Sequence, residues 1–84
     1  ISCDGICLTI NSIINKNNKF YFNTSITEET FKRTTAQFWD NNSIINLEQS
    51  LRVGDEISGH FVYGHIDTTF NVLKIEKLNT SWIF

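Results

Sequence analysis

Apolar and polar positions alternate near the start of the chain. Residues 6–11 have the order Ile-Cys-Leu-Thr-Ile-Asn, so the three aliphatic side chains share one face of an extended segment, and Cys, Thr and Asn share the other. Residues 1–3 are also extended in character, and Asp4-Gly5 between the two segments is a strong signal for a tight turn. The pattern predicts a short antiparallel hairpin at the N-terminal end.

A change of pattern after residue 24 predicts one short helix. Ser25 is followed three positions later by Glu28, which is the spacing of a capping box, and Thr27 is an alternative N-cap. Acidic residues then come first, and Lys32 and Arg33 come last, as the helix dipole favours. We therefore expect a helix over residues 28–34.

The rest of the chain is rich in β-branched and aromatic residues, which favour strands. We expect strands over residues 20–26, 44–48, 61–63, 68–77 and 81–84, with loops or turns over residues 15–19, 35–43, 52–58 and 79–80. Gly64 directly follows an aromatic run and predicts a bulge or a close approach of two backbones. Several short strands and one short helix indicate an all-β fold, a small antiparallel barrel or sandwich.

Size and composition exclude several classes of protein. The chain has 84 residues, of which 40% are hydrophobic and 19% charged, so it forms at most one domain with a modest core. No apolar run is long enough to span a membrane, and we expect no signal peptide in these residues. The net charge of −2 argues against a nucleic-acid partner. Two cysteines are too few for a disulfide scaffold and indicate a reducing compartment. Because the first residue is Ile1, we expect a fragment or a trimmed product.

The spacing of cysteine and histidine does not predict a metal site. Cys3 and Cys7 lie at one end of the chain, and the only histidines are His60 and His65. A structural zinc site needs four converging ligands. The odd separation of the two histidines places them on opposite faces of a strand. We therefore expect no bound metal.

Several side chains are candidates for chemistry, and each also has a structural interpretation. His60 and His65 flank an aromatic run, where they suit either proton transfer near neutral pH or hydrogen bonds that fix a barrel corner. Cys7 is either a functional thiol or a small buried apolar side chain. Four hydroxyl side chains lie near the first strands and the start of the helix, at Thr9, Ser25, Thr27 and Thr30. They either bind a polar ligand or cap the helix and support the strands.

Four ordered blocks resemble the riboflavin synthase family of lumazine-binding barrels. They are Gly-Ile-Cys-Leu-Thr-Ile at residues 5–10, Glu-Thr-Phe-Lys-Arg-Thr at 29–34, Asn-Leu-Glu-Gln-Ser-Leu-Arg-Val-Gly-Asp at 46–55 and Ser-Gly-His-Phe-Val-Tyr-Gly-His-Ile-Asp at 58–67. Any one block alone is a weak signal, whereas four in order over most of the chain are specific. Departures from the family's usual residues occur at Asp4, Ser58, Thr68-Thr69 and the loop 37–43, and none of them falls on a candidate site residue.

The resemblance implies a six-stranded antiparallel Greek-key barrel with one short helix. The Cys-Leu-Thr block and the paired-histidine block are typical of the family's N-terminal barrel. We therefore expect residues 1–84 to form part of that barrel, without its opening strand and without the family's second barrel. A missing strand is expected to leave sheet edges exposed. The resemblance also implies a cytoplasmic enzyme.

The activity implied by the resemblance is that of riboflavin synthase. Two molecules of 6,7-dimethyl-8-ribityllumazine exchange a four-carbon unit, which gives riboflavin and 5-amino-6-ribitylamino-pyrimidinedione without a metal or an organic cofactor. The reaction occurs where barrels of neighbouring subunits face each other in a homotrimer. The residues implied for catalysis are Cys7, His65 and His60, and those implied for substrate binding are Thr9, Ser25, Thr27, Thr30 and Gly64.

Two other functions fit the same sequence. A lumazine or flavin carrier without catalytic activity uses the same barrel, and a small β-barrel interaction module requires no ligand at all. A second copy of the barrel pattern in the complete gene favours the enzyme over the carrier.

Overall fold

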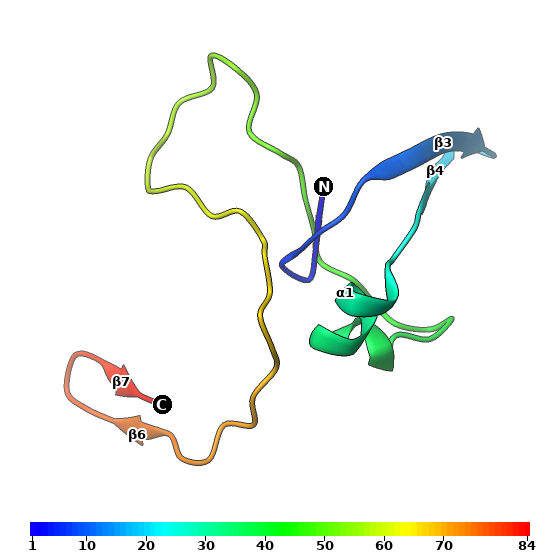
Figure 1. Ribbon diagram of the computed structural model, residues 1–84. Helices are drawn as coiled ribbons and strands as arrows, with labels where there is room; N and C mark the ends of the chain where they lie inside the picture. The colour runs from blue at the N-terminus through cyan, green and yellow to red at the C-terminus, as the bar shows by residue number, and fades with distance from the viewer.

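The computed structural model describes all of residues 1–84 and contains three small antiparallel sheets (Figure 1). The first has the strand order β2-β1-β5 and consists of β1 (Ser2–Cys3), β2 (Ile6–Cys7) and β5 (Leu47–Glu48). The other two are the hairpins of β3 (Ile10–Lys16) with β4 (Lys19–Thr24) and of β6 (Glu76–Lys77) with β7 (Trp82–Ile83). The helix α1 (Glu28–Arg33) and the 3-10 helix η1 (Thr35–Phe38) follow β4. Neither helix has the length or the apolar character needed to cross a membrane.

The predicted N-terminal hairpin is confirmed. Its turn residues Asp4 and Gly5 have φ values of 50° and 83°, the left-handed pair that a tight two-residue hairpin turn requires. Side chains alternate as expected, because Ile6 and Leu8 are buried whereas Cys7 is exposed. The single strand expected over residues 6–11 is instead divided into β2 and the start of β3. The cause is a change of partner, since Leu8 pairs with Ile1 through backbone hydrogen bonds and Ile10 pairs with β4.

The ribbon of β3 and β4 is longer than expected and projects away from the rest of the chain (Figure 1). The loop predicted over residues 15–19 is only the two-residue turn Asn17-Asn18, and the strands pair up to Lys16 and Lys19. Both asparagines have positive φ, 53° and 58°. Asparagine tolerates this conformation better than most residues, which allows a turn as short as two residues.

The helix forms where it was predicted, and its N-cap is Thr27. The backbone N–H of Thr30 donates to the Thr27 hydroxyl at 3.2 Å. The alternative cap, Ser25, instead accepts a hydrogen bond from an asparagine side chain of β3, so the capping-box interpretation is wrong. The helix ends at Arg33 because Thr34 is extended and its hydroxyl caps η1.

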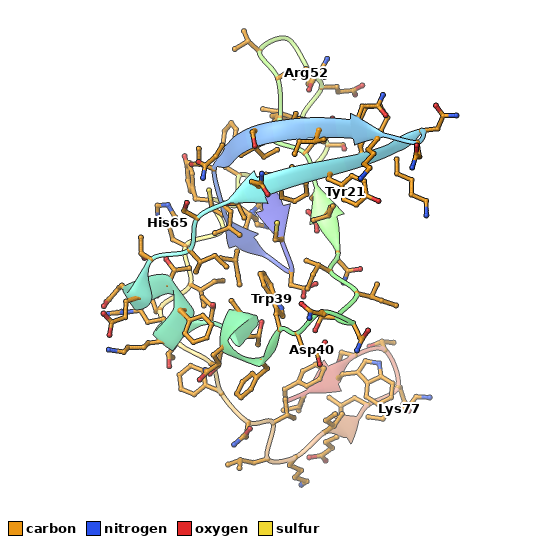
Figure 2. All side chains as sticks on the ribbon, turned by 90° about the vertical axis from the view of Figure 1, so that its right-hand side faces the viewer. Tyr21, Trp39, Asp40, Arg52, His65 and Lys77 are labelled. Atoms are coloured by element: carbon orange, nitrogen blue, oxygen red, sulfur yellow. The ribbon has the colours of Figure 1, made fainter.

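The core lies between the N-terminal hairpin and the two helices. Its buried apolar members are Cys3, Ile6, Leu8 and Ala36, and the half-buried side chains of Ile1, Phe22, Ile26, Trp39 and Ile45 pack against them. Figure 2 shows Trp39 between the hairpin and the helices. Thr34 is the one buried polar residue, and its hydroxyl donates to the Thr30 carbonyl at 2.8 Å and accepts from the Ala36 N–H at 3.2 Å.

The second half of the chain has fewer strands than predicted. Residues 49–75 contain no helix and no strand, so the strand expected over residues 61–63 is wrong, and only the end of the one expected over residues 68–77 forms, as β6. The strands expected over residues 44–48 and 81–84 shorten to β5 and β7. Strand residues need a neighbouring strand for their backbone N–H and C=O groups. Residues 49–75 pair with no strand and follow an extended path in Figure 1. The turn predicted at Asn79-Thr80 is confirmed between β6 and β7.

The structure is strand-rich with one short α-helix, as expected, but it does not form a closed barrel. Its accessible surface is 8008 Å², whereas a compact chain of this mass exposes about 5,100 Å². Its radius of gyration is 16.3 Å, whereas a compact chain of this length has roughly 12 Å. These residues are thus more open than a compact chain, the six-stranded Greek-key barrel stays a prediction, and many large apolar side chains of the second half are exposed.

Candidate functional site

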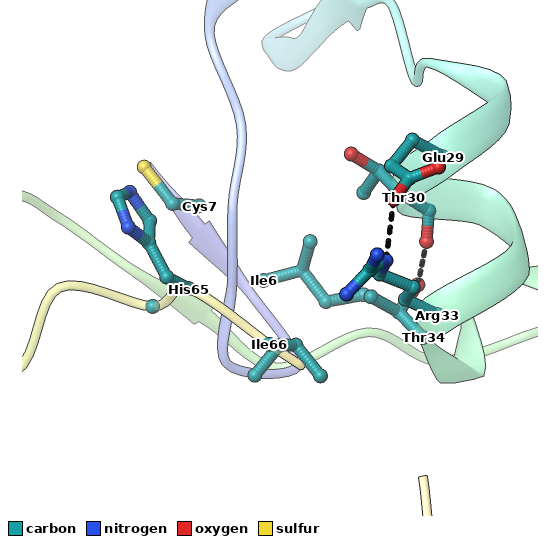
Figure 3. Close-up of a pocket in the computed structure, with 9 residues that line it drawn as sticks. Ile6, Cys7, Glu29, Thr30, Arg33, Thr34, His65 and Ile66 are labelled. Carbon is teal, nitrogen blue, oxygen red and sulfur yellow. Dashed lines mark hydrogen bonds and ion pairs between the residues drawn. The ribbon is translucent and has the colours of Figure 1, made fainter. Parts of the chain in front are cut away.

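A cavity of about 200 Å³ lies between β2, α1 and residues 64–66 (Figure 3). Three separate segments line it, and their residues are Ile6 and Cys7, then Glu29, Thr30, Arg33 and Thr34, then Gly64, His65 and Ile66. These segments belong to three of the four sequence blocks described above, at residues 5–10, 29–34 and 58–67. The fold therefore joins blocks that are far apart in the sequence at a single place.

A close contact of two backbones forms one wall of the cavity. The Cys7 N–H donates to the Gly64 carbonyl at 3.1 Å. Gly64 has a φ of 68°, and a Cβ at this position would lie 2.9 Å from the Gly5 carbonyl oxygen and 3.1 Å from the Cys7 nitrogen. The close approach predicted at Gly64 is thus confirmed. It brings the Cys7 thiol and the next residue, His65, to the same wall (Figure 3).

The opposite wall is one face of α1. Glu29, Thr30 and Arg33 fall on this face because residues three and four apart on a helix lie one above the other, and Thr34 follows directly after the helix. The Glu29 carboxylate pairs with Arg33 Nε at 2.5 Å. The Thr30 hydroxyl lies 3.0 Å from that of Thr27. Of these lining residues only Thr30 was predicted, although helical periodicity counted from Thr30 would have indicated Arg33 and Thr34 as well.

The two predicted histidines lie on different cavities. His65 lines the cavity just described, whereas His60 lines a larger one of about 930 Å³ between the N-terminal hairpin and residues 48–64. The His60 ring nitrogen Nδ1 lies 3.1 Å from the Phe61 carbonyl oxygen. Cys7 and Gly64 line both cavities. The geometry therefore groups Cys7 with either histidine, but not with both in one cavity.

The remaining hydroxyl candidates, Thr9, Ser25 and Thr27, line neither of these cavities. The Thr9 carbonyl accepts a hydrogen bond from the Thr24 hydroxyl at 2.7 Å. Ser25 binds a side chain of β3, and Thr27 caps α1. These contacts hold β3, β4 and α1 together, and the binding roles of the three residues stay predictions.

The two thiols of the N-terminal hairpin have opposite environments. Cys3 points into the core, and only 3% of it is exposed, whereas Cys7 is exposed on the other face of the hairpin. Burial raises the pKa of the Cys3 thiol above its ordinary value; the positive amino group of Ile1 opposes that rise, and the Asp4 carboxylate adds to it. Cys3 is therefore a neutral packing residue near neutral pH.

Thiol labelling tests this difference. We expect a maleimide to modify Cys7 roughly tenfold or more faster than Cys3 near neutral pH, because the reactive species is an accessible thiolate. Mass spectrometry of digested protein measures the two rates, and denatured protein, in which the rates should converge, is the control. Equal rates in the native protein would contradict the burial of Cys3.

No group of three or more His, Cys, Asp or Glu side chains that could hold a metal ion occurs in the structure. The absence of a bound metal stays a prediction. We expect that a chelator leaves the unfolding transition unchanged. Stoichiometric zinc, whose removal unfolds the protein, would overturn the prediction.

Fold and cavity together define a small strand-rich domain with a polar cavity beside its only α-helix. Residues 1–50 match the family described as the lumazine binding domain. The chain belongs to the lumazine-binding domain family.

The chain is similar to curated riboflavin synthases. The enzyme of Brucella abortus is 43% identical over 75 residues, which cover 88% of this chain and 37% of the relative. That of Chlamydia muridarum is 42% identical, covering 92% of this chain and 37% of the relative. That of Saccharomyces cerevisiae is 32% identical, covering 100% of this chain and 34% of the relative. The chain thus spans little more than a third of their length, and the resemblance found in the sequence is confirmed. No solved structure matches the chain.

Proposed function

We propose that residues 1–84 supply part of the N-terminal barrel of a riboflavin synthase and one wall of its substrate site. The observation that carries this proposal is that Cys7, Thr30 and His65, from three separate sequence blocks, line one cavity. Membership of the lumazine-binding family and the riboflavin synthase relatives support it. The proposed ligand is 6,7-dimethyl-8-ribityllumazine.

The cavity offers both apolar and polar surface to this ligand. The lumazine ring is planar, neutral and polar, and a few fixed polar groups orient such a ring in its site. Ile6 and Ile66 supply apolar surface. The hydroxyls of Thr30 and Thr34 and the ion pair of Glu29 with Arg33 make the rest of the lining polar. Because the Thr34 hydroxyl is buried and already hydrogen-bonded twice, Thr30 is the better donor to the ligand.

The reaction needs a nucleophile and a carrier of protons. One lumazine loses a proton from its C7 methyl group, and a nucleophile adds to the other. The bond to the nucleophile breaks again as the four-carbon unit passes between the two molecules, and this regenerates the nucleophile. Both substrates are the same compound, so one donates the unit that the other receives, and no external oxidant or reductant is required. We assign the nucleophile to Cys7 and the proton transfer to His65, because they share one wall of the cavity. His60 is the second candidate, from the neighbouring cavity.

The size of the cavity implies a second surface. It measures about 200 Å³, whereas small-molecule sites are usually about 300–1,000 Å³. We propose that a second barrel, of the same or a neighbouring chain in a homotrimer, supplies the missing wall, and that the six-stranded Greek-key barrel closes in the whole protein. The exposed apolar side chains of the second half supply the surface that such partners would bury. We also propose a cytoplasmic location, because Cys3 and Cys7 are free thiols.

Substitution of Cys7 and His65 in the whole protein, meaning the gene product that contains these residues, tests the assignment. Cys7→Ala and His65→Ala should each lower kcat roughly 100-fold or more with a smaller effect on KM, because each removes an interaction used in the chemical steps. Riboflavin formation, followed by absorbance, measures both constants. If Cys7→Ala leaves kcat within about twofold, Cys7 is a packing residue and its assignment is wrong.

His60→Ala is the matched comparison, because it removes the other histidine. We expect it to lower kcat less than His65→Ala does, since His60 lies on the neighbouring cavity. A larger loss in His60→Ala would reverse the two assignments. Lumazine fluorescence measured beside riboflavin formation separates enzyme from carrier, because a carrier binds the ligand and forms no riboflavin.

A further inference from the structure

The segment that carries His65 is attached to the rest of the chain on both sides of that residue. Residues 49–75 contain no helix or strand that could hold His65 in place. On the N-terminal side, the Gly64 carbonyl accepts from the Cys7 N–H at 3.1 Å. On the C-terminal side, the Asp67 carbonyl accepts from Arg33 Nη1 at 3.4 Å. The two hydrogen bonds enclose His65 and Ile66, which both line the cavity.

Arg33 makes two contacts at once, and its contact with Glu29 orients the guanidinium for its contact with Asp67. Its Nε pairs with the Glu29 carboxylate on the same helix at 2.5 Å. A guanidinium is planar and rigid, so fixing Nε also fixes the direction of the remaining N–H groups. Nη1 is thereby directed at the Asp67 carbonyl. Figure 3 shows Arg33 on the α1 side of the cavity, across from Cys7 and His65.

We propose that Arg33 is a positioning residue that fixes residues 65–67 against α1 and thereby holds the His65 imidazole beside Cys7. The first tether alone leaves the chain free to rotate after Gly64, because a glycine has no Cβ and can adopt many backbone conformations. The second tether, three residues later, restricts that freedom. Any effect of Arg33 on the reaction rate rests on the proposed function, whereas its effect on the position of His65 does not.

The chemistry of Arg33 cannot be fully reproduced by lysine. A lysine ammonium is a point charge on a flexible stem and lacks the fork that directs one N–H at Glu29 and another at a carbonyl. Lysine can therefore restore the attraction to either partner but not the fixed direction between them. The neighbouring Lys32 shows the contrast, because it pairs with Glu28 and takes no part in either the cavity or the tether.

The test compares Arg33→Ala and Arg33→Lys with the control Lys32→Ala in the whole protein. NMR spectra of the histidine side chains report the placement of His65, and His60 serves as an internal reference on the other cavity. We expect Arg33→Ala to shift or broaden the His65 signals and leave those of His60 unchanged. Arg33→Lys should give an intermediate change, and Lys32→Ala none. In turnover, we expect Arg33→Ala to lower kcat roughly tenfold or more with KM within about threefold, since small displacements of a reacting group have large effects on rate.

Two outcomes would overturn the proposal. One is that Arg33→Ala changes the His65 signals no more than Lys32→Ala does. The other is that it changes the signals of both histidines equally, which would indicate a general loss of structure. The spectra decide the placement of His65 even if the protein forms no riboflavin, so a failure of the proposed function is distinguishable from a failure of the tether. If the spectra support the tether but kcat is unchanged, the catalytic part of the proposal is wrong.

Discussion

The isolated 84 residues are expected to form riboflavin at least about 10⁵-fold more slowly than the whole protein under the same conditions. Holding two reactants in the correct geometry lowers a barrier by roughly 7–11 kcal/mol, and each 1.36 kcal/mol is about tenfold in rate. A cavity of about 200 Å³ cannot enclose two lumazines. The isolated chain should therefore lose most of this contribution, and initial rates at equal concentrations of sites measure the difference.

The state of association must be measured in the same samples. Sedimentation shows whether the isolated chain is a monomer during the assay, and the whole protein with Cys7→Ala gives the background rate for a damaged site. Substantial turnover by a monomeric fragment would contradict the shared site. Turnover that appears only when the fragment associates would agree with it, because a second copy then supplies the missing surface.

Gly64→Ala in the whole protein is expected to weaken lumazine binding roughly tenfold or more. A side chain at the φ of 68° is disfavoured by about 1–2 kcal/mol. The added Cβ would also lie 2.9 Å from the Gly5 carbonyl oxygen, so the two backbones must separate. That separation lengthens the hydrogen bond from the Cys7 N–H to the Gly64 carbonyl and moves His65 away from Cys7. Fluorescence titration with 6,7-dimethyl-8-ribityllumazine measures the affinity.

Two other glycines provide matched controls for this substitution. Gly54 has a φ of 97° with nothing within 4 Å of an added Cβ, so Gly54→Ala carries the conformational strain without the contact. Gly59 has neither feature. We expect Gly59→Ala to bind lumazine normally and Gly54→Ala to lose stability but little affinity. If Gly64→Ala binds as well as Gly59→Ala, the close approach does not shape the site.

Local signals were sufficient for the parts of the fold that depend on local interactions. Asp4-Gly5 specifies its turn through left-handed φ values, and α1 follows from an N-cap hydroxyl and charges that complement the helix dipole. The choice between Ser25 and Thr27 as cap was not local, because Ser25 is engaged by a side chain of β3. Sequence spacing alone does not show that competition.

The strands predicted in the second half are absent or shortened because strand formation depends on a partner segment and not on local signals alone. Residues 68–77 have the composition of a strand, but a strand forms only where another segment pairs with it. Within these 84 residues the only pairing available to this region is the short β6–β7 hairpin. The composition of a segment shows that it favours an extended conformation, but it does not show which other segment pairs with it.

The candidate site shows the same division. Cys7, Thr30, Gly64 and His65 were singled out from the residue pattern, the resemblance supplied their expected roles, and they do meet at one cavity. Helical periodicity counted from Thr30 places Arg33 on the cavity, but the contact of Arg33 with a backbone carbonyl 34 positions away has no signature in the side-chain pattern. Conversely, the hydroxyls of Thr9, Ser25 and Thr27 matched the expected chemistry but lie outside the cavity.

The most direct test of the account is the position of bound lumazine in a crystal structure of the whole protein. We predict that the ring lies in the cavity between β2 and α1, in contact with Cys7, Thr30 and His65, and that a second barrel covers its open side. A ring bound against His60 in the larger cavity, or one enclosed by residues 1–84 alone, would contradict the account.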